Sequence, residues 1–192
     1  MTDAIYFEDS SDQAHRGVVT LELRGKSKAS DTPGGVNEEA TSNPPACQLE
    51  HSVEADVSPS FAWNWRTNVE NWDDPPARFQ LDGPFVRGSS GTTLFPGQAP
   101  LHWRIRDVQL GRSFVIEMPL DQAVLSFEWR FDPLADRRTR ITQRIVLSGD
   151  NASAFAEQVQ VNFSATLGDG MKRIADAMAR AERSTETGSD HD

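Results

Sequence analysis

The feature that most constrains the fold is a long amphipathic stretch near the end of the chain, residues 151–181. We predict one long helix here, and such a helix needs a concave apolar partner. Gly168 and Gly170 lie inside it at a cost of about 1 kcal/mol each relative to alanine, so they indicate either close packing against the helix or a bend. The large apolar side chains recur at spacings of three and four residues, as on a helix with one apolar face: Phe155, Val159, Phe163, Leu167, Met171, Ile174 and Met178.

The chain before this helix alternates between apolar and polar residues, which is typical of half-buried strands. The first strand spans 47–57, and Ser58-Pro59 then supplies an N-cap followed by proline at the first helical position, which predicts a helix to about Asn71. Tight connections at 110–112 and 132–136 indicate hairpins, so we expect an α+β fold whose antiparallel sheet of about seven strands follows chain order. The further strands are predicted at 77–81, 92–95, 101–109, 113–120, 123–131 and 138–148.

Large apolar side chains gather on the inward faces of these elements, where they either fill a core or line an apolar pocket. The helix after Ser58 contributes an inner stripe of Phe61, Trp65, Val69 and Trp72. The opposite face of the strands is rich in arginine and glutamate, as a solvated face should be. The candidate ligand-binding residues are Trp65, Trp72, Trp103, Phe114, Ile116, Met118, Phe127, Trp129, Ile141, Phe163, Leu167 and Met171.

Composition limits the possible functions. The net charge of −10 falls mostly on the ends of the chain, with −4 in residues 1–45 and −3 in 182–192, and without a basic stripe we expect no nucleic-acid partner. The single cysteine, Cys47, excludes an intrachain disulfide and, with no activating base evident, predicts a small buried residue rather than a nucleophile. The sequence contains no phosphate-binding loop, zinc motif or esterase motif, so we expect no metal and no cofactor.

We expect three regions along the chain: a poorly ordered acidic extension at 1–45, a folded domain at 46–181 and a disordered acidic tail at 182–192. Within the extension, residues 18–23 have the composition of a short strand. No apolar run is long enough to span a membrane, and the first residues lack the pattern of a secretory signal, which predicts a cytoplasmic protein. No feature of the sequence indicates an oligomeric state.

Several short segments, taken in this order of elements, point to a known family. They are Glu50-His51-Ser52-Val53, Ser58-Pro59-Ser60-Phe61-Ala62-Trp63, Asn71-Trp72, the segment 83–89, the segment 110–114 and the segment 170–175. Together they resemble the START-like superfamily, also called the SRPBCC or polyketide cyclase/dehydrase and lipid-transport group. The resemblance covers roughly residues 47–180 and implies the helix-grip fold, in which a curved antiparallel sheet encloses a cavity against the final helix.

His51 and Gln143 are the candidate catalytic residues. By alternation His51 lies on the apolar face of its strand, where an imidazole either acts as acid or base on a bound ligand or serves as a structural histidine bonded to a neighbour. Gln143 and Thr139 share an inward face, and they either orient a carbonyl or hydroxyl group of a ligand or cap each other.

Three functional hypotheses follow from these residues and this resemblance. The leading one is a protein that binds a hydrophobic small molecule, lipid-, polyketide- or isoprenoid-like, between the final helix and the sheet. The second is an aromatase/cyclase-like enzyme that promotes aldol closure and dehydration, with His51 as acid or base and Gln143 orienting the chain. The third is a partner-regulating domain with a vestigial cavity, in which the acidic tails make the contact.

Overall fold

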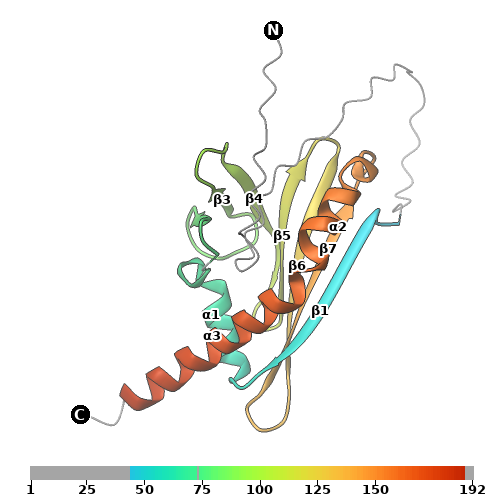
Figure 1. Cartoon of the computed structure of the whole chain (residues 1–192). Helices are drawn as coiled ribbons and strands as arrows, with labels where there is room; N and C mark the ends of the chain where they lie inside the picture. Colours follow the sequence, from blue (N-terminus) through green and yellow to red (C-terminus); the bar gives the residue numbers. More distant parts are fainter. Residues whose placement is uncertain (1–43, 73, 189–192) are drawn as a thin grey trace, which may run out of the picture.

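The computed structural model describes residues 44–72 and 74–188, and the short strand expected at 18–23 lies outside them. All the strands belong to one antiparallel sheet of seven, in the order β1-β7-β6-β5-β4-β3-β2 (Figure 1). The two predicted hairpins are confirmed, and β2 to β7 follow chain order as expected, but β1 departs from that order and pairs with β7. The strands are β1 Cys47–Ala55, β2 Arg78–Leu81, β3 Ser90–Leu94, β4 Leu101–Gln109, β5 Ser113–Leu120, β6 Ala123–Pro133 and β7 Thr139–Ser148.

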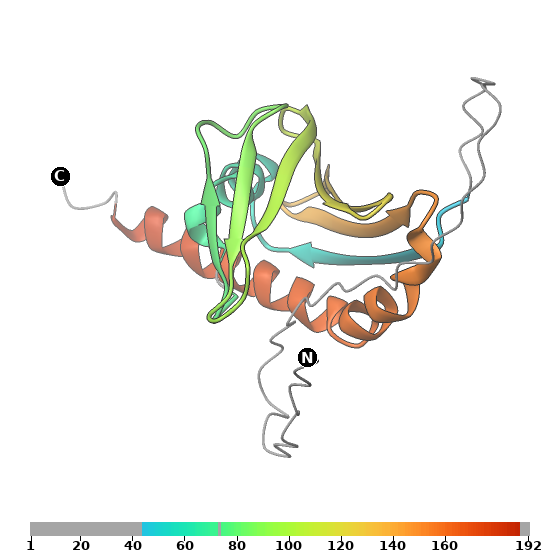
Figure 2. The ribbon, with the colours of Figure 1, turned by 90° about the horizontal axis from the view of Figure 1, so that it is seen from above.

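The sheet is strongly bent rather than flat. In β4 the pairing with β5 shifts register between Ile105 and Asp107, and an extra residue of this kind bends a strand and increases its twist. Figure 2 shows the result: the green strands β2 to β4 stand steeply across the direction of β1 and β7, and α2 and α3 lie along the open side. The curvature gives the sheet the concave face that the amphipathic stretch requires.

The helical end of the chain differs from the single helix that the sequence predicts. A short 3₁₀ turn, η2 (Ala152–Ala154), precedes α2 (Ala156–Ser164), and a separate helix α3 (Leu167–Gly188) follows. The break has a local cause, because the Thr166 hydroxyl donates to the Asn162 carbonyl at 3.1 Å while its backbone N–H turns to Phe163. One apolar stripe therefore continues across two helices that meet at an angle (Figure 1).

The last helix passes the boundary expected at residue 181, because α3 continues to Gly188. Glu182 explains why the helix extends. Its carboxylate accepts hydrogen bonds from the Ser58 hydroxyl at 2.7 Å and from the Ser58 backbone N–H at 3.2 Å. Ser58 in turn caps the first helix, α1 (Pro59–Thr67), by accepting from the Phe61 N–H. The end of α3 and the start of α1 are thus held together.

The apolar core has two parts on the concave face. One part lies under α1, where the Trp63 ring packs edge-on against Phe114 and Phe131 at 6.0 and 5.8 Å. The other lies under η2 and α2, where Phe155 and Val159 meet the ends of the β5 to β7 strands. The face that the sequence assigns to solvent carries ion pairs, as expected: Glu117 lies between Arg104 and Arg106, and Glu54 lies between Arg138 and Arg140.

Candidate functional site

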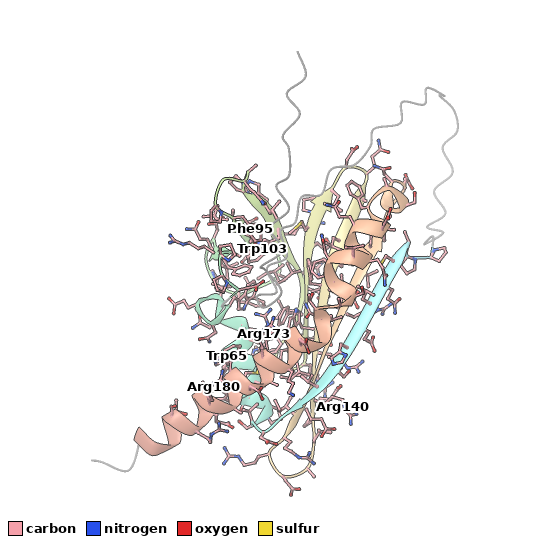
Figure 3. The ribbon with its side chains drawn as sticks, viewed as in Figure 1. Trp65, Phe95, Trp103, Arg140, Arg173 and Arg180 are labelled. Carbon is pink, nitrogen blue, oxygen red and sulfur yellow. The ribbon has the colours of Figure 1, made fainter. Side chains whose placement is uncertain are left out.

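Between the two parts of the core, the concave face is left uncovered and forms a cavity of about 510 Å³. Its walls come from β2 to β7, from the end of α1 with the 3₁₀ turn η1 (Val69–Asn71), and from α2 and α3. Figure 3 shows Trp65, Trp103 and Phe95 on the side of α3 where α1 and β2 to β4 lie. The structure brings most of the candidate residues to this cavity: Trp65, Trp72, Trp103, Ile116, Met118, Phe127, Trp129, Gln143, Phe163 and Leu167.

Three of the candidate residues lie behind the cavity wall instead. Phe114, Ile141 and Met171 are at most 1% exposed and belong to the core under α1. Phe114 supports the wall, because its ring stacks behind that of Trp129 at 6.1 Å and 20°. Alternation along a strand predicts which face a side chain occupies, but it does not predict how deeply the neighbouring elements cover it.

The cavity persists because its largest rings are anchored at their polar edges. The indole N–H of Trp72 donates to the Arg66 carbonyl at 2.8 Å, and that of Trp103 donates to the Thr93 hydroxyl at 3.1 Å. The Trp103 ring also lies flat over Gly91 of the neighbouring strand, where a Cβ atom would fall 2.2 Å from the ring carbons. Rings held in this way line the space without collapsing into it.

His51 lies on the concave face of β1 but outside the cavity. It pairs across the strands with Gln143, and the start of α3 crosses above it so closely that a Cβ on Gly168 would lie 3.2 Å from the imidazole. This explains the first helical glycine as a close-packing position. The exposed imidazole lines a separate, shallower pocket with Asp169 and Lys172. The acid–base role of His51 therefore stays a prediction that this placement does not favour.

Gln143 does line the cavity, next to Trp129 in the register of β6 and β7. Its amide forms no side-chain hydrogen bond with any residue in 44–72 or 74–188, so it is available to a ligand. Thr139, the other polar residue predicted on this face, is fully buried and donates to the Val57 carbonyl at 2.9 Å. Of the two, only Gln143 faces the cavity.

The most distinctive polar group of the cavity, Arg66, is not among the residues predicted from the sequence. Its guanidinium carbon lies over two rings, 4.5 Å from the centroid of Trp72 and 4.1 Å from that of Trp129. Burial lowers the pKa of the Arg66 side chain to about 9, so it remains a cation at neutral pH. Its Nε atom is buried without a hydrogen-bond partner.

A signal for Arg66 is present in the helical pattern. The predicted inner stripe of α1, which includes Phe61 and Trp65, packs against the core, but the buried residues of the helix are Ala62 and Trp63 beside it. Arg66 lies four and three residues after those two, on the same face one turn later. A stripe widened to include Ala62 and Trp63 would have placed an arginine on the inward face of the helix.

The remaining charged side chains lie on α3 and in the loop before β2. Arg173, Asp176 and Arg180 of α3 line the cavity with Asp74, and Figure 3 shows the two arginines beside Trp65. Among the described residues no group of three or more histidine, cysteine or acidic side chains is arranged to hold a metal ion. None of the described helices is both long and apolar enough to cross a membrane.

The comparisons with known proteins agree with this geometry. The family model described as polyketide cyclase/dehydrase and lipid transport matches residues 46–181. The Zhui aromatase/cyclase from a Streptomyces species is similar in structure, with a TM-score of 0.55 and 14% identity over 69% of this chain and 93% of that one. Norcoclaurine synthase from Thalictrum flavum has a TM-score of 0.52 and 13% identity over 70% and 91%. At such identities these likenesses show the helix-grip fold alone. No curated protein sequence gives a significant match.

Proposed function

Because the chain belongs to the polyketide cyclase/dehydrase and lipid-transport family, whose members are ligand-binding domains, we propose that it binds one hydrophobic small molecule in the cavity under α3. The observation that carries this proposal is the cavity itself, about 510 Å³ lined by anchored aromatic rings. A lipid-, polyketide- or isoprenoid-like body would bury its surface there at about 25 cal/mol per Å² before the costs of ordering it.

The experiment uses N-phenylnaphthylamine, a neutral probe whose fluorescence rises in apolar surroundings. We expect the full chain to bind it, and Leu167→Trp, which places an indole in the cavity, to weaken binding by at least tenfold. Val161→Trp is the matched control, because Val161 is 67% exposed on α2 and a ring there reaches only solvent. Equal binding by both variants would show that the probe does not occupy this cavity.

A second candidate is the aromatase/cyclase-like enzyme, and the free amide of Gln143 in the cavity wall is the observation in its favour. It would hold a carbonyl group of a reactive chain while the shape of the cavity sets the fold of that chain. With His51 outside the cavity, this candidate has no identified acid or base, so it ranks below the binding function. Turnover of a poly-β-ketone by the wild type that Gln143→Leu abolishes would reverse the order.

A further inference from the structure

The Arg66 side chain is a cation in an aromatic-lined cavity, with no acidic partner among the described residues. It forms no side-chain hydrogen bond or ion pair with any residue the structure describes, and its Nε is buried. Removing an arginine from water is costly, and folded proteins normally offset that cost with a carboxylate. The rings of Trp72 and Trp129 supply part of the compensation through cation–π attraction. They accept no hydrogen bonds in the plane of the guanidinium, and on its N–H edge the Nε–H is buried without a partner.

The surroundings hold this edge in a fixed place. The indole of Trp72 is tied to the Arg66 carbonyl at 2.8 Å, and the Asn71 amide donates to the Trp65 carbonyl at 2.8 Å, so the corner between α1 and η1 is braced. Trp129 is only 2% exposed and is backed by the stacked ring of Phe114. A guanidinium fixed in this way presents its donors as a preformed fork.

We propose that the ligand is an amphipathic acid whose carboxylate binds in the plane of the Arg66 guanidinium while its apolar body fills the aromatic cavity. This inference rests on the proposed function. A carboxylate is planar and accepts two parallel N–H···O bonds, which suits an edge that lies over aromatic faces. Its single negative charge matches a single buried positive charge. The other charged residues that line the cavity are exposed to solvent, which leaves Arg66 as the partly buried cation that a ligand would meet: they are Asp74, Arg173, Asp176 and Arg180.

The test compares ligands that differ only in the headgroup: decanoate against decanol, and pyrenebutyrate against pyrenebutanol, titrated calorimetrically into the full chain. We expect each acid to bind about 10- to 100-fold more tightly than its alcohol, the size of charge-assisted hydrogen bonds made away from water. Equal affinity of acid and alcohol would refute the inference that the ligand binds Arg66 through a carboxylate, but it would not contradict the proposed function. Failure of both pairs and of the neutral probe would overturn the proposed function as well.

Variants of Arg66 then test whether this side chain causes the preference for the acid over the alcohol. Arg66→Met should abolish the preference for the acid and leave alcohol binding within about twofold, while Arg66→Lys, which keeps the charge and loses the fork, should retain only part of it. Arg112→Met is the matched control, since Arg112 is exposed on the turn between β4 and β5, away from the cavity. An acid preference that survives in Arg66→Met would refute the assignment. If decyl phosphate bound more tightly than decanoate, the inferred headgroup of the ligand would be a phosphate and the carboxylate would be refuted.

Discussion

Glu182 offers the sharpest quantitative test of how the two ends of the domain are held together. Its side chain is only 12% exposed, and it accepts from both the hydroxyl and the backbone N–H of Ser58 at the start of α1. Hydrogen bonds to a charged group contribute about 1.5–3 kcal/mol, and a carboxylate at a helix N-terminus adds about 0.3–1 kcal/mol. The contact with Arg137 at 3.7 Å adds little, because that arginine is 70% exposed.

In Glu182→Ala, water can replace the carboxylate as the acceptor for the Ser58 hydroxyl and N–H, which limits the loss. We therefore expect this variant to lower the free energy of unfolding by about 2 kcal/mol. Glu182→Gln keeps an acceptor oxygen and should cost about 1 kcal/mol. For a domain of this size the alanine variant should lose about 5–10 °C in Tm. Urea unfolding followed by tryptophan fluorescence measures both values.

Two shortened chains provide the control. A chain ending at Thr185 keeps Glu182 and should match the full chain within about 0.5 kcal/mol, whereas a chain ending at Ala181 loses it and should fall by about 2 kcal/mol. Identical urea midpoints for the two shortened chains would refute the reasoning, because α3 would then end functionally at residue 181.

Three further predictions follow from the cavity wall and its surroundings. Gly91→Ala should displace the Trp103 ring and cost about 1–3 kcal/mol in urea unfolding, and an unchanged midpoint would contradict the close contact. Below about pH 9 Arg66 is charged in both the folded and the unfolded chain. Above about pH 9 the folded chain releases the proton while the unfolded chain still keeps it, so the burial of Arg66 destabilises the fold less as pH rises. Arg66→Met removes this desolvated cation, so it should be more stable than the wild type at pH 7 and its advantage should shrink at pH 10; a difference that stays constant would refute this. Burial raises the pKa of the Cys47 thiol, so alkylation by iodoacetamide should be slow in the native protein and fast in urea; equal rates would contradict its burial.

The strands were predictable because their signal is local. Each one alternates with period two, and each hairpin is closed by a turn within a few residues, so neither depends on distant parts of the chain. The break between α2 and α3 was not predictable from periodicity, because the apolar stripe from Phe155 to Met178 continues through it. The cause lies in the hydroxyl of Thr166, whose bond to Asn162 competes with the helical pattern.

For the site, the sequence predicted the face of each strand but not the depth of each residue on it. Phe114 and Trp129 are paired across β5 and β6, yet Phe114 lies in the core against Trp63 of α1, whereas Trp129 lines the cavity. His51 and Gln143 also share a row, and α3 passes over His51 so that only Gln143 faces the cavity. Such differences arise from where helices cross the sheet, which no strand pattern contains.

The closure of the sheet has a consequence for how the protein is made. β1 is the first strand that the structure describes, and among the described strands it pairs with β7, the last. During synthesis Cys47–Ala55 must therefore wait, with its backbone groups bonded to water, until Thr139–Ser148 has left the ribosome. Topologies dominated by such distant pairings fold slowly, because the entropy of loop closure is lost before the strand pairing stabilises the chain. The cavity and the packing of α3 against β1 are thus among the last features of the molecule to form. A ligand can therefore bind only after nearly the whole domain has been synthesised.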